Sequence, residues 1–250
     1  MKAMVFAAGL GTRLRPITDS IPKALVPVCG QPLLSHVLRK LSCAGYTDVV
    51  VNVHHFPEQI KDYLSAHDFG LNIRISDESA QLLETGGAIA HARNLLLDAE
   101  EEPFLVHNVD IVSNLDIPWF RAQSRPGALS MLLVSERKTQ RSLLFRREDM
   151  RLVGWTNSVT GEVKSPYRDL NPSECLSYAF AGIHNISPEI FKVFDAMMVP
   201  ERFSIIDFYL DACARYPVYG VPAQGLRLVD VGKADKLAEA EIICSEILGA

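Results

Sequence analysis

The order of the apolar segments limits the fold more than any other feature of this 250-residue chain. In the first half, short apolar runs rich in β-branched residues alternate with segments whose apolar residues recur at helical spacing. Such nearly continuous apolar strands, joined by helices, are typical of a mostly parallel sheet covered on both faces. The expected strands span residues 3–8, 48–53, 71–76 and 103–110, and the expected helices span residues 32–45, 57–67 and 86–99.

The pattern changes near residue 128, where short strands follow one another without helices between them. This succession predicts an antiparallel insertion, followed by further helices and short strands. We find no internal repeat and no linker, so we predict a single α/β domain over residues 1–250 with a mixed, mostly parallel central sheet. The expected strands are 128–135, 141–147, 151–157, 176–187, 217–223 and 226–232; the expected helices are 188–198, 203–216 and 233–248; residues 165–175 are expected to form a loop.

Composition excludes several classes of function. The formal net charge is −5, so the chain has no overall basic field for nucleic acid. No apolar run approaches the roughly 20 residues that span a bilayer, and we expect no membrane partner. The five cysteines are odd in number and form no C-x-x-C pair, which favours reduced thiols in a cytoplasmic protein. The N-terminus enters a strand directly, without the pattern of a signal peptide.

The first expected strand leads into a glycine-containing segment, Gly9-Leu10-Gly11. Glycine after a strand lets backbone N–H groups approach an anion, although an ordinary tight turn explains the same pattern. A dinucleotide fingerprint would need a third glycine where Leu14 stands, and an acid after the second strand, where the chain reads VNVHH. A Walker A loop would need Gly-Lys followed by Ser or Thr, which does not occur.

The residues after these glycines supply donors and cations. Thr12 offers a hydroxyl, Arg13 a planar fork of donors, and Lys23 a compact charge ten residues further on. Pro16, Pro22 and Pro27 restrict the backbone around them. Such a stiff, cationic loop suits a triphosphate; the alternative is that these are solvated surface charges.

The whole stretch resembles the signature of the sugar-1-phosphate nucleotidyltransferases, G-x-G-T-R-L-x-P-x-T-x-x-x-P-K followed by P-[VIL]-x-x-x-P. The similarity continues through LLETGGAI, NVD, YAFAGIHNISP and VDVG, and so extends over nearly the whole chain. It implies a Rossmann-like nucleotidyltransferase fold, and condensation of a nucleoside triphosphate with a sugar 1-phosphate to a nucleotide sugar and pyrophosphate. The matched residues are Gly9, Gly11, Thr12, Arg13, Leu14, Pro16, Thr18, Pro22, Lys23 and Pro27.

Two aspartates are candidate ligands of Mg²⁺, which binds one or two protein carboxylates. Asp110 ends an expected strand, and Asp230 follows a second one and precedes Gly232. Either residue could instead cap a turn or a helix. The resemblance gives both the metal role, with Val109 standing where the family has glycine. The resemblance also implies that Arg13, Lys23 and Asp110 are the catalytic residues, with Arg13 and Lys23 in contact with phosphates.

The resemblance also assigns the two substrates to parts of the chain. Residues 1–127 are expected to bind the nucleotide and residues 128–250 the sugar phosphate. Gly86 and Gly87 are poor mid-helix residues and suggest a close approach there. The adjacent His54 and His55 are expected to be structural rather than metal ligands. The remaining nucleotide-binding candidates are Ala8, Gly9, Gly11, Thr12, Glu84 and Thr85, and the sugar-phosphate candidates are Lys164 and Gly182.

We therefore expect a Mg²⁺-dependent enzyme acting on a hexose 1-phosphate, similar to N-acetylmuramate-1-phosphate uridylyltransferases and mannose-1-phosphate guanylyltransferases. The sequence does not separate UTP from GTP, and a homo-oligomer is possible. One alternative is a phosphocholine cytidylyltransferase, which uses a similar opening segment. A second alternative is a non-catalytic subunit that binds a nucleotide sugar for regulation.

Overall fold

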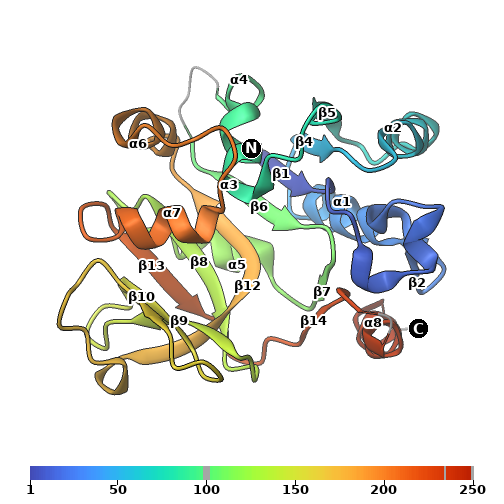
Figure 1. The fold of residues 1–250 in the computed structure, drawn as a ribbon. Helices are drawn as coiled ribbons and strands as arrows, with labels where there is room; N and C mark the ends of the chain where they lie inside the picture. Colours follow the sequence, from blue (N-terminus) through green and yellow to red (C-terminus); the bar gives the residue numbers. More distant parts are fainter. Residues whose placement is uncertain (98–101, 234, 249–250) are drawn as a thin grey trace.

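The computed structural model describes residues 1–97, 102–233 and 235–248. In its N-terminal half, four parallel strands form the centre of the fold (Figure 1). They lie in the order β6-β1-β4-β5 and confirm the four strands expected there. Every residue of β4 except the first is buried, as expected for a strand covered on both faces. The strands are β1 (Lys2–Phe6), β4 (Asp48–Val53), β5 (Asn72–Asp77) and β6 (Phe104–Asn108).

The second half adds the antiparallel insertion to the same sheet. The long strand β12 (Leu176–Ile186) pairs antiparallel with β6, and also with β8 and β9. Ten strands of the described residues thus form one mixed sheet. The remaining strands are β8 (Ser130–Ser135), β9 (Arg141–Phe145), β10 (Leu152–Asn157), β11 (Val163–Lys164) and β13 (Val218–Pro222).

Two small antiparallel ribbons lie beside this sheet. In the first, β2 (Pro27–Val28) pairs with β3 (Gln31–Pro32), and in the second, β7 (Ile111–Ser113) pairs with β14 (Leu228–Asp230). Of these four short strands only β14 was expected from the sequence. Four single turns of 3₁₀-helix complete the irregular parts: η1 (Thr12–Leu14), η2 (Ile17–Asp19), η3 (Lys23–Leu25) and η4 (Pro172–Glu174).

Helices cover both faces of the sheet, and each face has its own apolar core. One core includes residues of α1 (Leu33–Cys43), α2 (Pro57–Ala66), α5 (Ile117–Ala122) and α8 (Asp235–Leu248). The other includes residues of α3 (Glu84–His91), α4 (Arg93–Leu96), α6 (Ile190–Met197) and α7 (Ile205–Ala212). Among the described residues, no helix is both long and apolar enough to cross a membrane.

Some expected helix bounds were wrong. The helix expected over 86–99 is interrupted at Ala92, where ψ is 4°, so the segment forms α3 and α4; residues 98 and 99 lie outside the described part. The helix expected over 203–216 begins at Ile205, because the Ser204 hydroxyl caps it by accepting a hydrogen bond from the Asp207 N–H at 3.4 Å. Tertiary contacts and caps, rather than periodicity, determine where these helices begin and end.

Candidate functional site

One cavity lies where β1, β4 and β6 end, at the edge where open α/β sheets bind ligands, and a second cavity adjoins it. Ser204 lines both of them. The first cavity has a volume of about 370 Å³ and the second about 990 Å³. The first contains the predicted residues Ala8, Gly9, Lys23, Glu84, Thr85 and Asp110, and the second contains Arg13, Lys164 and Asp230.

Gly11 shapes the opening loop rather than lining either cavity. Its φ is +64°, and a Cβ there would lie 2.8 Å from Thr18 Cγ2 and 3.2 Å from Lys23 Cβ. The Thr18 hydroxyl donates a hydrogen bond to the Gly11 carbonyl at 2.8 Å, which closes the loop on itself. Gly11 therefore allows Lys23 to fold back toward the sheet, while Gly9 faces open space and Thr12 is exposed.

Lys23 and Asp110 form a nearly buried ion pair. The Lys23 ammonium donates to Asp110 Oδ2, and their side chains are only 11% and 17% exposed. Asp110 is held in place from β6 through Val109, whose N–H donates to the Phe6 carbonyl at 3.2 Å. Val109 is buried and does not have a positive φ, so this position does not require the family's glycine.

The β7–β14 ribbon brings Asp230 beside Asp110. Asp230 pairs with Ile111 in the ribbon, and the Val231 N–H donates to the Asp110 carbonyl at 2.8 Å. Asp230 Oδ1 is buried and has no hydrogen-bond partner among the described residues. Burial, and then the charge of Asp110, raise the pKa of Asp230. Two acids and an unsatisfied buried oxygen fit a divalent cation such as Mg²⁺.

The described residues contain no group of three or more His, Cys, Asp or Glu side chains placed to hold a metal. Such a group is not required, because Mg²⁺ usually keeps water and substrate phosphates as its other ligands. Arg13 also reaches the carboxylates: a Cβ on Gly232 would lie 2.7 Å from Arg13 Nη2 and 2.8 Å from Asp230 Oδ1. The glycine thus leaves room for the guanidinium beside the acid.

The glycines at the start of α3 contact a neighbouring loop. A Cβ on Gly86 would lie 2.3 Å from the Phe203 ring, and one on Gly87 would lie 2.3 Å from the Glu201 carbonyl. Both glycine N–H groups donate to the Phe203 carbonyl, at 2.9 and 3.2 Å. The close approach expected here is therefore made by residues 201–203, and it joins the beginnings of α3 and α7.

The two side chains before these glycines take part in the same junction. Thr85 Oγ1 accepts a hydrogen bond from the Ile205 N–H at 3.0 Å. Glu84 has a φ of +62°, and its carboxylate pairs with Arg202 at 2.9 Å. Both residues also line the first cavity, so this junction forms one of its walls.

Sequence reasoning missed a buried polar pair that lines the first cavity. Asn52 Oδ1 accepts from the Ala7 N–H at 2.8 Å, and Asn52 Nδ2 donates to Glu78 Oε1 at 2.7 Å. The Leu83 N–H donates to Glu78 Oε2 at 3.3 Å, and burial raises the pKa of this acid. The available signal was an asparagine within the apolar run DVVVNV. Asn108, Arg137 and Arg141 also line the cavities and were not predicted.

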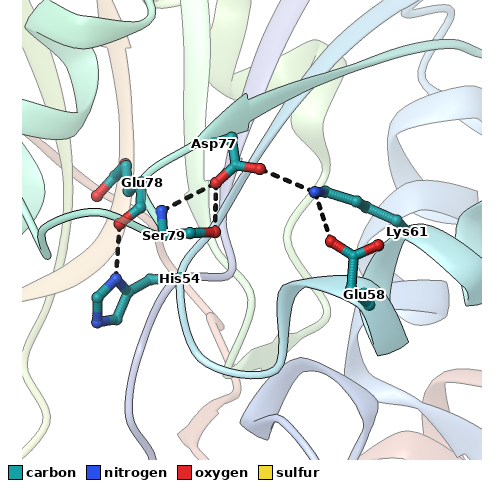
Figure 2. A network of polar contacts seen from close by, with 6 residues as sticks. All are labelled: His54, Glu58, Lys61, Asp77, Glu78 and Ser79. Carbon is teal, nitrogen blue, oxygen red and sulfur yellow. Dashed lines mark hydrogen bonds and ion pairs between the residues drawn. The ribbon is translucent and has the colours of Figure 1, made fainter.

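A network of polar contacts lies beside Glu78, as Figure 2 shows. Lys61 on α2 bridges Glu58 and Asp77, at 2.8 Å to each carboxylate. Asp77 also accepts from the Ser79 N–H at 2.9 Å, which fixes the turn that leads past Glu78. His54 lies against the carbonyl of Glu78, with 2.6 Å between its Nδ1 and that oxygen.

His55 Nε2 lies 3.4 Å from the Thr18 carbonyl oxygen, so His54 and His55 each contact a main-chain oxygen.

Gly182 lies behind Asn108, because a Cβ there would be 2.8 Å from Asn108 Nδ2. Lys164 stands on the outermost strand β11, 3.4 Å from the Asp207 carboxylate. It lines the second cavity together with Arg13 and Asp230.

Comparison with known proteins decides the family. The model of a family described as nucleotidyl transferase matches residues 2–137, which include Asp110. The chain belongs to this family. It is 35% identical over 248 residues to the N-acetylmuramate alpha-1-phosphate uridylyltransferase of Caulobacter vibrioides, with 96% of each chain covered. The prediction of a nucleotidyltransferase enzyme is confirmed.

Other relatives match a smaller part of the chain. Mannose-1-phosphate guanylyltransferase 1 of Arabidopsis thaliana is 39% identical over 114 residues, which are 45% of this chain and 32% of the plant protein.

The fold resembles that of HddC from Yersinia pseudotuberculosis, with a TM-score of 0.73 at 20% identity, covering 96% and 98% of the two chains. UDP-glucose pyrophosphorylase from Acinetobacter baumanii gives a TM-score of 0.76 at 17% identity, covering 97% and 92%. The nucleotidyltransferase fold is thereby confirmed.

Proposed function

We propose that the protein transfers a nucleotidyl group from a nucleoside triphosphate to a sugar 1-phosphate and releases pyrophosphate. In this reaction a sugar phosphate oxygen attacks the α-phosphorus in line. The observation that carries the proposal is the pair Asp110 and Asp230, which lie between two cavities and beside Lys23 and Arg13. No covalent intermediate on the enzyme is needed, so positioning and charge stabilisation supply the catalysis.

The two cavities suit the two substrates. The first, between the opening loop and the start of α3, would hold the nucleotide against Ala8, Gly9, Glu84 and Thr85. The second would hold the sugar phosphate, with Lys164 at its far wall. In this proposal residues 1–127 bind the nucleotide and residues 128–250 bind the sugar phosphate. Gly11 and Thr12 would act through the loop, and Gly182 through the position of Asn108.

Asp110 and Asp230 would hold Mg²⁺, which neutralises phosphate charge and polarises the phosphate when bound. Lys23, which now pairs with Asp110, and Arg13 would contact phosphate oxygens and stabilise the charge that develops on the leaving pyrophosphate. These four side chains give the site two acids for a cation and two cations for anions.

Among sugars, the relative that aligns over almost the full length favours N-acetylmuramate 1-phosphate, and among nucleotides UTP. The guanylyltransferase relative matches only 45% of this chain, so it supports mannose 1-phosphate and GTP less strongly. A cytoplasmic location and a homo-oligomer stay predictions.

Pyrophosphate release measures the activity directly. Purified protein is tested with UTP, GTP and CTP against N-acetylmuramate 1-phosphate, mannose 1-phosphate and phosphocholine, with and without Mg²⁺. We expect metal-dependent release with UTP and the first sugar phosphate. Release with none of the pairs would refute the proposal, and release only with CTP and phosphocholine would replace it.

The variant Asp110→Asn should lower turnover by about 10²- to 10³-fold, because an oriented charge is lost from the transition state. The matched control is Asp211→Asn, which changes an exposed carboxylate outside both cavities. Circular dichroism of both variants should match that of the wild type. Wild-type turnover in Asp110→Asn would remove this residue from the site.

A further inference from the structure

One wall of the second cavity is a face of the strands β9, β10 and β11, at one end of the mixed sheet. Alternate residues of a strand point to the same face, and here Arg141, Trp155, Asn157 and Lys164 all line the cavity. Arg141 is the cross-strand partner of Asn157, and Trp155 is the partner of Lys164. The two pairs therefore lie on one surface, together with Leu143, the other cross-strand partner of Trp155.

This surface contains hydrogen-bond donors that have no acceptor among the residues that the structure describes. Asn157 Oδ1 already accepts from the N–H groups of Val159 and Thr160, at 3.0 and 3.4 Å. Its amide nitrogen donates to no atom of the described residues, and neither does the guanidinium of Arg141. Partners directly opposite in a sheet have Cβ atoms about 5 Å apart. Arg141 is exposed and Asn157 is half-buried, so a charged fork and an amide donor stand together at the cavity surface, where a ligand can accept from both.

Lys164 differs from Arg141 in this respect. Its ammonium lies 3.4 Å from the Asp207 carboxylate and 5.4 Å from the centre of the Trp155 ring. The aromatic ring and the acid therefore already satisfy much of its charge. Arg141 also belongs to a segment, residues 137–147, with five cations and no carboxylate. Lys138, Lys233 and Glu162 also line the cavity, so its cations outnumber its acids. Arg141 forms no ion pair with any described residue.

The position of this surface separates it from the reacting phosphate. Asp230 lies in β14 and Arg13 in η1, whereas Arg141 lies at the start of β9 on the wall of the same cavity. Strand β9 is the neighbour of β12 in the sheet, and Leu143 of β9 pairs with Tyr178 of β12. Arg141 precedes Leu143 by two residues and is therefore about level with Phe180, which follows Tyr178 by two. The two strands are roughly 5 Å apart. A group bound there would extend sideways from a sugar held near Gly182.

We infer that Arg141 and Asn157 bind a carboxylate carried by the sugar, so that the enzyme selects acidic sugar 1-phosphates over neutral ones. The inference rests on the proposed function and narrows its sugar substrate. The planar guanidinium suits a carboxylate because two N–H groups can donate to its two oxygens. The Asn157 amide adds a third donor from the opposite strand.

Steady-state kinetics with UTP and Mg²⁺ can test this with two sugars that differ in one group. N-acetylmuramic acid 1-phosphate and N-acetylglucosamine 1-phosphate differ only in a lactyl ether with its carboxylate. The wild type should have a kcat/KM at least about 10-fold higher for the acidic sugar. Because hydrogen bonds to charged groups are lost, Arg141→Gln should lower this value by about 10- to 100-fold. The same variant should leave the neutral sugar within about twofold.

Two further variants keep the test decisive. Asn157→Asp preserves the oxygen that caps the turn but puts a negative charge in place of the donor, so the acidic sugar should lose at least as much as with Arg141→Gln. Arg168→Gln removes an exposed arginine of the same half of the chain outside the cavity and should change neither sugar. Equal losses for both sugars would indicate a structural role and overturn the inference.

The failure of this inference is distinguishable from the failure of the proposed function. If the wild type converts the neutral and acidic sugars equally well, the enzyme reaction stands and the carboxylate site is wrong. If no sugar 1-phosphate releases pyrophosphate, both are wrong. Glucose 1,6-bisphosphate serves as a third substrate, and a preference for it that Arg141→Gln abolishes would assign these donors to a phosphate instead.

Discussion

Replacing Asn52 by alanine should destabilise the protein and weaken nucleotide binding together. The side chain joins three segments: it accepts from the Ala7 N–H and donates to Glu78, and Glu78 in turn accepts from the Leu83 N–H. Asn52, Ala7 and Glu78 are all buried. Removing the amide leaves one buried donor and one buried acceptor without partners, and each such group costs about 1–3 kcal/mol. We expect a loss of about 3 kcal/mol.

A loss of this size is easy to measure in a protein of 250 residues. Since 1 kcal/mol shifts the Tm of a domain this large by about 2–4 °C, the variant should melt about 6–12 °C lower. The KM for the nucleotide should rise by about 10-fold, because Glu78 and the opening loop line the first cavity, where we propose that the nucleotide binds. The KM for the sugar 1-phosphate should stay within twofold.

Asn72→Ala is the matched control on the neighbouring strand. Asn72 also donates from its amide to a carboxylate, Asp48 at 2.8 Å, but this pair is exposed to water. Its loss should change the Tm by no more than about 2 °C. The reasoning is wrong if Asn52→Ala melts within 2 °C of the wild type, or if both KM values rise equally.

Two further variants test other parts of the structure. Alanine normally stabilises a helix relative to glycine by about 1 kcal/mol. Gly87→Ala should instead lower the free energy of unfolding by about 1–3 kcal/mol, because its Cβ would lie 2.3 Å from the Glu201 carbonyl. Stabilisation in a urea titration would contradict the close contact at the junction of α3 and α7. Burial lowers the pKa of Lys40 from 10.5 to about 8, so the unfolded state binds more protons than the folded state between these two pH values. The free energy of unfolding should therefore rise with pH across this window, by roughly 3 kcal/mol in total. Lys40→Met should remove this rise, and an equal pH dependence of unfolding in both proteins would refute the prediction.

The sequence predicted the parallel strands and the two aspartates for a physical reason. A strand that is buried on both faces must be apolar along its length, so β1, β4 and β6 are visible as runs, and an acid at the end of such a run is conspicuous. Asp110 and Asp230 were found in this way and through the family signature. The structure places both at the junction of the two cavities.

Other parts of the site have no local pattern. The function of Asn52 depends on the strand beside it and on a glutamate 26 residues away. The need for Gly86 and Gly87 comes from residues 201–203, more than a hundred positions later in the chain. Arg141 and Asn157 face each other only because of the register of β9 and β10. Contacts of this kind depend on tertiary packing, which single-sequence patterns do not encode.

The β7–β14 ribbon has a consequence for the order in which the molecule folds. It joins residues 111–113 to residues 228–230, so the loop that it closes contains more than a hundred residues. Closing so long a loop is entropically costly, and contacts of such long range form slowly. Most of the parallel sheet is encoded before residue 110, whereas Asp230 follows Asp110 by 120 residues. A growing chain on the ribosome therefore carries one acid of the pair through the synthesis of about 120 further residues before the second acid is added.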